Sequence, residues 1–418
     1  MSEKFDVVVI GAGAAGIVAA GRASQLGARV LLLEKMAQEG RKMRISGKGR
    51  CNITNDASIS EFVKHVHPSG NFLKPALSCF YNKAIIELLN LQQVETVLER
   101  GGRYFPKSNK AVDVVQALVN WAKQQGVSIW LNSKLEAIQI HEKQVQGLTF
   151  SENNHKKQVS CRSLILCTGG YSYPATGSNG EGHVAAKQLG HTIEAVRPAL
   201  VPIKVDEALV KNLAGLNLRN VKASVWSNNK KLADDFGEVT FAEWGLTGPI
   251  ILTLSRIMVD ELRAGSEVVL SLDLKPALTE QTLDARLLRD IDANGKMSLK
   301  KLFKLWLPMQ LIEPFQNLLS LDENKLANQL SSADRRRIRI LMKDWRFQVS
   351  GYRPFKEAII TAGGIRTSEI NAKTMESKLI KDLFFAGEII DVDADTGGYN
   401  LQIAFSTGWL AGSSCVKR

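Results

Sequence analysis

The sequence predicts an α/β protein in which a three-layer, Rossmann-like domain is interrupted by a β-barrel-like insert and a helical insert. Three observations predict this fold. A strand, a glycine-rich turn and a helix follow one another at the start of the chain, and strand and helix patterns of the same kind return at its end. Between them the pattern changes first to short alternating runs and then to helical periodicity.

The N-terminal segment has the order expected of a βαβ unit. The apolar run Phe5–Ile10 leads into the glycine-rich turn Gly11–Gly16, and a helical stretch follows. A second apolar run ends on Glu34, which lies 18 residues beyond the last glycine of the turn. A strand, a turn of this spacing, a helix and a later acid together form the fingerprint of a dinucleotide-binding unit.

Each part of this fingerprint has a physical role. Gly11 permits the tight turn, Gly13 lets the backbone approach a pyrophosphate, and Gly16 lets the helix pack closely on the strand. The helix N-terminus directs unpaired N–H groups and a positive dipole end at the phosphates. Glu34 can accept hydrogen bonds from ribose hydroxyls and would repel a 2′-phosphate. The sequence therefore predicts a dinucleotide site, and both FAD and NAD remain candidates at this point.

The C-terminal segment favours FAD. The run 383–391 is typical of a buried strand that ends in a glycine and then acids, and Thr396–Gln402 opens a final helix. Such a returning strand and second helix N-terminus can hold a ribityl chain. The helix dipole can also stabilise negative charge at the N1–C2=O edge of a reduced flavin. We therefore expect non-covalent FAD, with its adenosine half held by the N-terminal segment and its flavin half by the C-terminal helix.

The chain also resembles a known family, the HI0933-like flavoproteins (YhiN-like and BaiN-like), in motifs that cover nearly its whole length. These motifs are Gly40–Lys42, Ser46–Asn55, Gly101–Pro106, Cys167–Ser178, Gly245–Pro249, Thr361–Gly364 and the two C-terminal segments above. The segment 40–55 is the most specific of them. The resemblance implies an FAD domain of the glutathione-reductase type and an FAD-dependent oxidoreductase, in a family whose names include NAD(P)/FAD-dependent oxidoreductase and aminoacetone oxidase-like enzyme.

The motifs and the resemblance together predict a set of cofactor-binding residues. Arg41, Lys42 and Arg50 would lie near the pyrophosphate, where cations stabilise the diphosphate, although solvated loop charges are the alternative for them. Leu135 lies where related flavoproteins make a backbone contact to adenine. The predicted residues are Gly11, Gly13, Ala14, Ala15, Gly16, Glu34, Lys35, Arg41, Lys42, Ser46, Gly47, Arg50, Cys51, Asn52, Leu135, Thr168, Gly169, Gly387, Glu388, Asp391, Gly398, Asn400, Leu401 and Gln402.

Catalytic residues are not evident from the sequence, and three side chains are weak candidates. Cys51 could act as a nucleophile or redox partner if Arg50 lowered its pKa, but a lone cysteine is more often a packing residue. Asn52 could bind the flavin edge or cap the turn, and Tyr173 could face the substrate or pack at the pocket rim. The family commonly has a histidine where this chain has Glu243 or Trp244. If that histidine acts in the chemistry, this protein either differs in substrate or does not need it.

The predicted domain organisation is discontinuous. Residues 1–197 and 350–418 form the FAD-binding domain, residues 198–274 and 344–349 a β-rich insert, and residues 275–343 a helical insert. Within the first domain we expect helices over 84–99 and 113–125, a hairpin over 134–152 and a strand over 163–167. The β-rich insert is expected to carry strands over 200–205, 221–226, 237–243 and 267–272, with a helix starting at Pro249. In the helical insert, Gly295, Pro308 and Pro314 are expected to stop helices.

Composition limits the partners and the compartment. The 418 residues are 44% hydrophobic and 23% charged, as in soluble globular proteins, and no apolar run approaches the length of a membrane span. Five cysteines without C-x-x-C spacing argue against disulfides, a zinc site or a dithiol centre, so we expect a reducing cytoplasm and no metal. The net charge of +12 invites a nucleic-acid interpretation. Its densest runs, 296–304 and 335–339, are better explained as solvated helix faces, with an anionic partner such as tRNA as the alternative.

Several functions remain open at the level of sequence. The leading hypothesis is an FAD-dependent oxidoreductase that takes hydride from NAD(P)H and reduces a small organic substrate. No second dinucleotide fingerprint follows a strand, so the nicotinamide would bind transiently over the flavin. The alternatives are an amine or aminoketone oxidase that uses O2, a flavoprotein associated with tRNA or another nucleic acid, and a flavin-bearing regulator without turnover.

Overall fold

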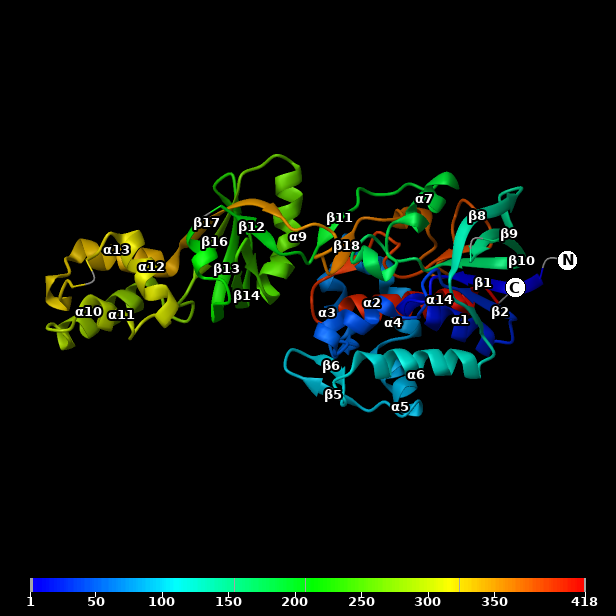
Figure 1. The fold of residues 1–418 in the computed structure, drawn as a ribbon, viewed down its shortest axis with the longest axis horizontal. Coiled ribbons are helices and arrows are strands. Elements are labelled where there is room, and N and C mark those ends of the chain that lie inside the picture. Colours follow the sequence, from blue (N-terminus) through cyan, green and yellow to red (C-terminus); the bar gives the residue numbers. More distant parts are fainter. Residues whose placement is uncertain (1–2, 154, 207, 323, 417–418) are drawn as a thin grey trace. The chain divides into compact units, whose positions relative to one another are not determined.

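The chain divides into two compact units, which are described separately. The computed structural model describes residues 3–153, 155–206, 208–322 and 324–416. Unit 1 comprises residues 1–198 and 355–418, and unit 2 comprises residues 199–354 (Figure 1). Both ends of the sequence therefore belong to the same unit, as the returning strand and helix patterns predict.

Unit 1 alternates strands and helices in its first half and closes with a long helix. Its elements before unit 2 are β1 (Glu3–Ile10), α1 (Ala14–Gln25), β2 (Val30–Leu33), α2 (Arg41–Ile45), β3 (Thr54–Asn55), α3 (Ile59–Phe62), β4 (Val66–His67), α4 (Lys74–Cys79), α5 (Asn82–Leu91), β5 (Thr96–Glu99), β6 (Arg103–Pro106), α6 (Ala111–Gln124), β7 (Ser128–Trp130), β8 (Ser133–His141), β9 (Gln144–Glu152), β10 (His155–Leu166), α7 (Glu181–Gln188) and β11 (Arg197–Ala199). Those after unit 2 are β18 (Ile360–Ala362), β19 (Leu383–Phe385), β20 (Asp393–Ala394) and α14 (Tyr399–Ser414).

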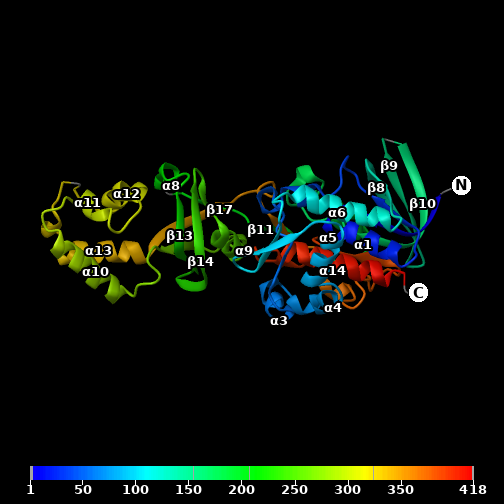
Figure 2. The ribbon, with the colours of Figure 1, turned by 90° about the horizontal axis from the view of Figure 1, so that it is seen from below.

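The main sheet of unit 1 has the strand order β7-β2-β1-β10-β9-β8, with β19 paired to β10. The long strand β10 joins two layers. Its first half pairs antiparallel with β9 in the meander, and its second half pairs parallel with β1 and β19. Helices α1, α6 and α14 pack together as a further layer (Figure 2). This arrangement confirms the predicted three-layer Rossmann-like domain.

Helices α1 and α14 come from opposite ends of the chain and pack with their backbones in close contact. A Cβ atom on Gly408 would lie 2.3 Å from the carbonyl oxygen of Ala15, and one on Gly412 would lie 2.3 Å from that of Ala19. Glycine at these two positions of α14 is therefore what allows the C-terminal helix to lie against the first helix. The core around them is formed largely by buried aliphatic side chains of β1, α1 and β2.

Unit 2 combines a barrel with a group of helices. Its elements are β12 (Ile203–Val205), α8 (Ala208–Asn212), β13 (Asn217–Ser227), β14 (Lys230–Ala242), β15 (Gly245–Thr247), α9 (Pro249–Arg263), β16 (Val268–Asp273), α10 (Glu280–Ala293), α11 (Leu299–Phe303), α12 (Met309–Leu319), α13 (Ser332–Lys343) and β17 (Trp345–Tyr352). The strands close in the order β12-β15-β14-β13-β16-β17, which confirms the barrel-like insert.

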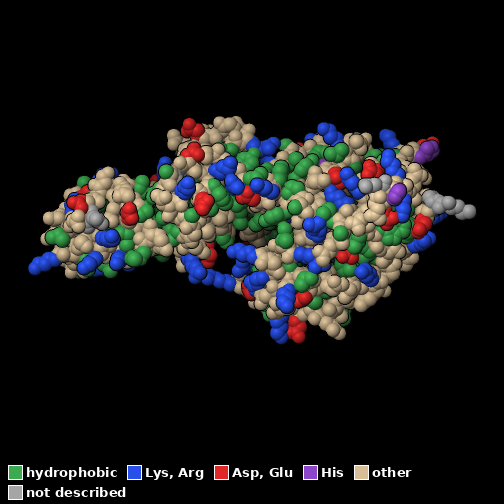
Figure 3. Space-filling model, viewed as in Figure 1, with side chains coloured by type: hydrophobic (Ala, Val, Ile, Leu, Met, Phe, Trp, Pro, Cys, Tyr) green, Lys and Arg blue, Asp and Glu red, His purple; other side chains and the backbone are tan. Residues whose placement is uncertain are grey.

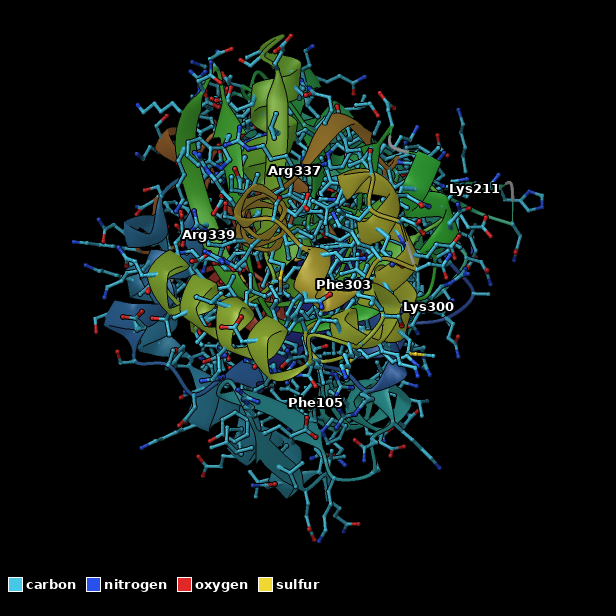
Figure 4. The ribbon with its side chains drawn as sticks, turned by 90° about the vertical axis from the view of Figure 1, so that its left-hand side faces the viewer. Phe105, Lys211, Lys300, Phe303, Arg337 and Arg339 are labelled. Atoms are coloured by element: carbon cyan, nitrogen blue, oxygen red, sulfur yellow. The ribbon has the colours of Figure 1, made fainter. Side chains whose placement is uncertain are left out.

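The helices of unit 2 share a core with its barrel. Leu270 on β16, Phe303 on α11, Phe315 on α12 and Trp345 on β17 belong to one buried cluster, and the ring centroids of Phe315 and Trp345 lie 5.2 Å apart. Figure 4 looks onto these helices and labels Phe303 among them. The predicted division of this part of the chain into a barrel insert and a helical insert remains a prediction.

Three of the predicted elements are wrong in detail. The strand predicted over 200–205 begins only at Ile203, because Leu200 has a left-handed backbone (φ 48°) that turns the chain. The helix predicted over 84–99 ends at Leu91, and residues 96–99 form β5. Gln93 has a left-handed backbone (φ 63°) that turns the chain, and the residues that follow are rich in β-branched side chains, which favour a strand. Pro314 does not stop a helix but lies inside α12, where burial of Leu311, Phe315 and Leu319 holds the helix through it.

All five cysteines are described, and none of them forms a disulfide. In the described part of the chain, no helix is both long enough and apolar enough to cross a bilayer.

Candidate functional site

The candidate site is a cavity of about 670 Å³ that is lined wholly by residues of unit 1. Its wall is built from the β1–α1 turn, the end of β2, α2, the start of β8, the loop after β10, the loop 176–182, the segment 386–388 and the start of α14. A volume of this size is typical of sites for cofactors and drug-sized ligands. The cavity therefore joins the two ends of the chain that the sequence motifs identified.

The three glycines of the β1–α1 turn differ in what a side chain would meet. Gly11 has a left-handed backbone (φ 98°), and a Cβ on it would lie 2.6 Å from the carbonyl oxygen of Cys167. A Cβ on Gly16 would lie 1.8 Å from the carbonyl oxygen of Gly11, so the helix packs directly on the turn. A Cβ on Gly13 would have nothing within 4 Å. Only this glycine faces open space on the cavity side, as a close approach of pyrophosphate requires.

Glu34 lies at the end of β2 and lines the cavity. Its carboxylate accepts hydrogen bonds from the backbone N–H of Ala12 at 2.8 Å and of Met36 at 2.9 Å. Burial raises the pKa of Glu34, and these two backbone donors act in the opposite direction. Each carboxylate oxygen keeps a second lone pair, so Glu34 can still accept hydrogen bonds from ribose hydroxyls.

Cations enter the cavity from α2. Arg41 and Lys42 both line it, and the Lys42 ammonium forms an ion pair with Glu388 at 2.6 Å. The other oxygen of Glu388 accepts the backbone N–H of Thr361 at 2.7 Å. Lys42 and Glu388 stand 346 residues apart in the sequence. This ion pair therefore joins the N-terminal motif to the C-terminal one inside the cavity.

The start of α14 is held by polar contacts that shape the far end of the cavity. Asn400 lines the cavity, and its side-chain amide accepts from the Ala394 N–H at 2.9 Å and donates to the Ala394 carbonyl at 2.7 Å. Gln402 is buried and bonds Thr54 and the Phe80 carbonyl, so it positions the helix. Gly398 precedes the helix with φ 98°, and a Cβ there would lie 2.9 Å from Asn52 Oδ1.

Two buried oxygens near the cavity have no hydrogen-bond partner within the described residues. They are Asn52 Oδ1, beside the N-terminus of α14, and Thr168 Oγ1, in the cavity-lining loop after β10. A buried polar atom without a partner is costly, so each is suited to a polar group of a ligand. These oxygens, the open side of Gly13 and the cations of α2 fit the polar groups and the diphosphate of FAD.

Most of the predicted cofactor residues meet at this cavity. Those that line it are Gly11, Gly13, Ala14, Ala15, Glu34, Lys35, Arg41, Lys42, Ser46, Leu135, Thr168, Gly169, Gly387, Glu388, Asn400 and Leu401. Those that lie outside its lining are Gly16, Gly47, Arg50, Cys51, Asn52, Asp391, Gly398 and Gln402. Gly16, Gly398 and Gln402 act on the packing and position of the two helices that face it.

The surroundings of Arg50 and Cys51 do not favour their predicted roles, which are a contact to the diphosphate for Arg50 and a reactive thiol for Cys51. The guanidinium of Arg50 pairs with Glu99, donates to Asn109 at 2.7 Å and lies 4.1 Å above the Phe105 ring. Cys51 is fully buried, and burial raises the pKa of its thiol to about 12. The thiolate is the reactive form, so the packing interpretation of Cys51 is favoured.

The other candidate side chains have mixed surroundings. Tyr173 has a left-handed backbone (φ 52°) before Pro174, and its pKa is raised by burial and by nearby Glu357. Such a strained non-glycine residue is more frequent at functional sites, so Tyr173 stays a candidate. His191 is buried between the Ala186 carbonyl at 3.2 Å and the Ser377 hydroxyl at 2.8 Å, as a structural histidine would be.

The predicted set of cofactor-binding residues left out a second group that lines the cavity, including residues 176–178 of the motif Cys167–Ser178. Ser133 and Lys134 precede the predicted Leu135, and Thr176–Asn179 and Glu181 follow the predicted Thr168–Gly169 segment. Lys35 holds this loop by bonding Asn179 at 2.7 Å and Glu181 at 2.8 Å. The signal for these residues was weak because polar loop residues carry no periodicity. Their position in the fold places them at the site.

The basic run 335–339 is used inside unit 2. Arg335 and Arg339, on α13, each lie 3.2 Å from Asp284 on α10, and Arg337 donates to the Leu319 carbonyl at the end of α12 (Figure 4). These contacts tie three helices together. They favour the structural interpretation of this run over an anionic partner.

Comparison with known proteins agrees with this site. The family model described as the HI0933-like protein Rossmann domain matches residues 5–414. The chain is 30% identical over 414 residues to a ribosomal RNA dihydrouridine synthase of Escherichia coli, covering 99% of this chain and 98% of that protein. It is 29% identical over 412 residues to a 3-dehydro-bile acid Δ4,6-reductase of Clostridium scindens, covering 98% of each. A second ribosomal RNA dihydrouridine synthase, from Haemophilus influenzae, is 28% identical over the whole length of both chains.

Solved structures give the same fold at low identity. A 3-ketosteroid Δ1-dehydrogenase of Sterolibacterium denitrificans matches with a TM-score of 0.52 and 15% identity, covering 99% of this chain and all of that one. A quinol–fumarate reductase matches with a TM-score of 0.52 and 17% identity, covering all of this chain and 72% of that one. The fold, the cavity and the full-length match lead to one conclusion: the chain belongs to the HI0933-like family and is an FAD-dependent oxidoreductase.

Proposed function

We propose that this chain transfers two electrons from a reduced nicotinamide dinucleotide, through FAD, to a carbon–carbon double bond conjugated to a carbonyl group. The observation that carries the proposal is the chemistry shared by two relatives of nearly full length that are named for different molecules. Making dihydrouridine from uridine reduces the C5=C6 bond next to a ring carbonyl, and the other relative is named for reducing double bonds of a 3-oxo bile acid. The bond change is common to both, although the substrates are not.

The proposed reaction balances without any other reductant. NAD(P)H gives up a hydride and becomes NAD(P)⁺, and bound FAD supplies the carrier for that electron pair. The substrate gains a hydride at the carbon β to its carbonyl and a proton from solvent at the α carbon, so the double bond becomes single. Within unit 1, the N-terminal end of α14 would stabilise negative charge that develops at the flavin edge, and the cations Arg41 and Lys42 would hold the diphosphate.

A uracil base in RNA is the substrate class that we propose. Two of the three full-length relatives described above are named for making dihydrouridine in ribosomal RNA. A 3-oxo steroid is the second candidate, supported by the bile acid reductase at 29% identity. The aminoketone oxidase hypothesis gains no comparable support, because these three relatives are named for reductive reactions.

Anaerobic stopped-flow spectroscopy tests this proposal in two steps. NADH or NADPH should bleach the 450 nm flavin absorbance faster than photoreduction controls, and a uridine-containing RNA should then restore it with formation of dihydrouridine. Restoration by a 3-oxo-Δ4 steroid and not by RNA would move the function to the second candidate. Bleaching by aminoacetone and not by either nicotinamide would favour the oxidase instead.

A further inference from the structure

Two short segments of unit 1 carry an unusual concentration of positive charge. Residues 41–50 and 100–110 together contain nine Lys or Arg residues and no Asp or Glu residue. The first segment contains α2 and the loop after it, and the second contains β6 and its flanks. The segments lie 50 residues apart in sequence, so their charge could act together only if the fold joined them.

The fold does join them. Strand β3, which follows the first segment, pairs antiparallel with β6 in the second, and the Ile53 N–H donates to the Tyr104 carbonyl at 2.8 Å. Arg50 stacks 4.1 Å above the ring of Phe105, which Figure 4 labels. A Cβ on Gly47 would lie 3.5 Å from the same ring. The buried ring of Phe105 in the second segment therefore packs against the loop of the first segment.

Part of this charge is already used by other groups in unit 1. Lys42 pairs with Glu388 in the cavity, Arg50 pairs with Glu99, and Lys107 pairs with Glu95. Glu99 is also the cross-strand partner of Arg103, but its carboxylate is engaged by Arg50. The other six cations of the two segments are Arg41, Arg44, Lys48, Arg100, Arg103 and Lys110.

Four of the remaining cations are exposed: Lys48, Arg100, Arg103 and Lys110. We call these four residues the basic face. Among the described residues, none of them forms an ion pair with a carboxylate, and Arg103 donates instead to the Arg100 carbonyl at 3.0 Å. In Figure 3, Lys or Arg side chains lie beside Asp or Glu side chains over the lower edge of unit 1, where Figure 1 places β5 and β6.

The backbone presents one of these cations in a costly conformation. Gly47, Lys48 and Gly49 all have left-handed backbones, with φ of 57°, 58° and 83°. A lysine rarely adopts this conformation, and here it lies exposed between two glycines. Three such residues in succession form a tight turn that holds Lys48 away from the fold. The left-handed backbone of Lys48 costs folding free energy, although its side chain forms no hydrogen bond or ion pair among the described residues.

The basic face begins at the rim of the cavity. Ser46 lines the cavity and is followed directly by the turn that carries Lys48. At the other end of the loop, Asn52 lies against Gly398 at the N-terminus of α14. The loop therefore runs from the cavity to the β5–β6 hairpin, and an extended anion bound there would reach the flavin end of the site.

We propose that the basic face binds the phosphate backbone of an RNA whose base enters the cavity, an inference that rests on the proposed function. Phosphate contacts position a nucleic acid without reading its sequence, and they come mainly from Lys and Arg. Four exposed cations that form no ion pair with a carboxylate among the described residues match a chain of phosphates. A bile acid carries a single carboxylate, so it would engage few of these four cations.

The test compares two triple variants with equal changes in charge. The first is Lys48→Gln with Arg103→Gln and Lys110→Gln. The control is Lys123→Gln with Lys156→Gln and Lys373→Gln, which are exposed positions elsewhere on unit 1. The probe is a fluorescein-labelled RNA hairpin with uridines in its loop, titrated by fluorescence anisotropy against the FAD-loaded full chain over a range of salt concentrations.

The first variant should bind the hairpin at least about tenfold more weakly. The slope of log K against log salt should fall by about 2 to 3, because each lost phosphate contact removes close to one unit. The control should keep both values, and both variants should keep their FAD and their rate of anaerobic bleaching by NADPH. The single variants Lys48→Gln and Lys110→Gln, at exposed positions, should each lower the slope if the triple variant does not fold.

Two results would overturn the proposal. Equal losses in the two triple variants would mean that RNA responds only to net charge. If the first variant shows slower bleaching of its flavin at low NADPH concentration and unchanged RNA affinity, the basic face binds the nicotinamide dinucleotide instead. Because binding is measured without turnover, a failure of the proposed reduction would leave wild-type RNA affinity in place, and the two failures are distinguishable.

Discussion

At the scale of single residues, the glycines of the β1–α1 turn separate ligand binding from folding. Gly13→Val adds a side chain where nothing lies within 4 Å, so the apo protein should fold as before. The same side chain would occupy the space of the pyrophosphate, and FAD affinity should fall about 100-fold, or roughly 2.7 kcal/mol. Thermal unfolding of the apo protein and FAD titration by flavin fluorescence measure the two effects.

Gly16→Val is the matched control, since its Cβ would lie 1.8 Å from a backbone oxygen. It should destabilise the apo protein by more than about 3 kcal/mol, because a backbone that close cannot be relieved by side-chain movement. Equal stability losses in the two variants would show that the turn does not distinguish ligand-facing from packing glycines.

Cys51 gives a second prediction at this scale. Burial raises the pKa of its thiol to about 12, so the thiolate is scarcely populated at neutral pH. Cys51→Ala should keep turnover within about twofold and should cost roughly 1 kcal/mol of stability through lost packing. Steady-state kinetics and urea unfolding check this, with the exposed Cys79→Ala as the control. A tenfold loss of turnover at unchanged stability would restore a catalytic role for Cys51.

At the scale of elements, a histidine–aspartate contact lies beside the paired strands β4 and β20, between the residue before β4 and the residue after β20. His65 Nδ1 lies 2.8 Å from Asp395 Oδ2, and the imidazole stacks on Tyr399 at the start of α14. The hydrogen bond to Asp395 raises the pKa of His65, although partial burial lowers it. Asp395 is itself partly buried, which raises its pKa, but the bonds from His65 and His67 lower it overall.

The raised pKa of His65 determines how the stability of the protein should change with pH. Its contribution to stability is fully present below the unfolded value near pH 6.5 and is lost as pH rises through the higher folded value. His65→Gln should therefore lower the melting temperature more at about pH 5.5 than at about pH 8.5. Differential scanning fluorimetry across this pH range measures the difference in melting temperature between the wild type and the variant. The variant His141→Gln, at an exposed position, is the control. A melting-temperature difference that grows as the pH rises would contradict a raised pKa of His65.

Sequence patterns predicted elements well where one face is regularly apolar. Helix α6, the barrel strands and the helix that starts at Pro249 follow such patterns. The patterns failed where tertiary packing decides. Residues 96–99 form a strand because β6 pairs with them, and Pro314 is tolerated because the apolar face of α12 is buried on both sides of it.

At the scale of the whole molecule, the cofactor site depends on both ends of the chain. The β1–α1 turn and the start of α14 line one cavity, and Lys42 reaches Glu388 across it. FAD at 100 times its dissociation constant should stabilise the protein by about 2.7 kcal/mol. Hydrogen exchange should then slow at both the start of α1 and the start of α14. Protection confined to the N-terminal segment would contradict a site shared by the two ends.

The fold of the whole molecule also explains which site residues could be predicted from the sequence and which could not. Gly11, Glu34 and Asn400 stand in motifs whose spacing has a physical meaning, so they could be predicted. Asn179 and Glu181 stand outside these motifs. Lys48 and Arg103 stand inside two of the family motifs, but no spacing there assigns a role to an exposed cation. Their positions follow from pairings such as Lys35 with Glu181 and β3 with β6, which only the fold makes visible.

The most direct test of the proposed reaction is a single anaerobic mixing experiment. Enzyme reduced with NADPH and freed of excess donor is mixed with uridine-containing RNA, and the 450 nm absorbance is followed. We expect the absorbance to return in step with one dihydrouridine formed per flavin, and faster than with RNA that already carries dihydrouridine. Flavin that stays reduced with RNA and with a 3-oxo-Δ4 steroid, but reoxidises with O2, would contradict the reduction of a conjugated double bond.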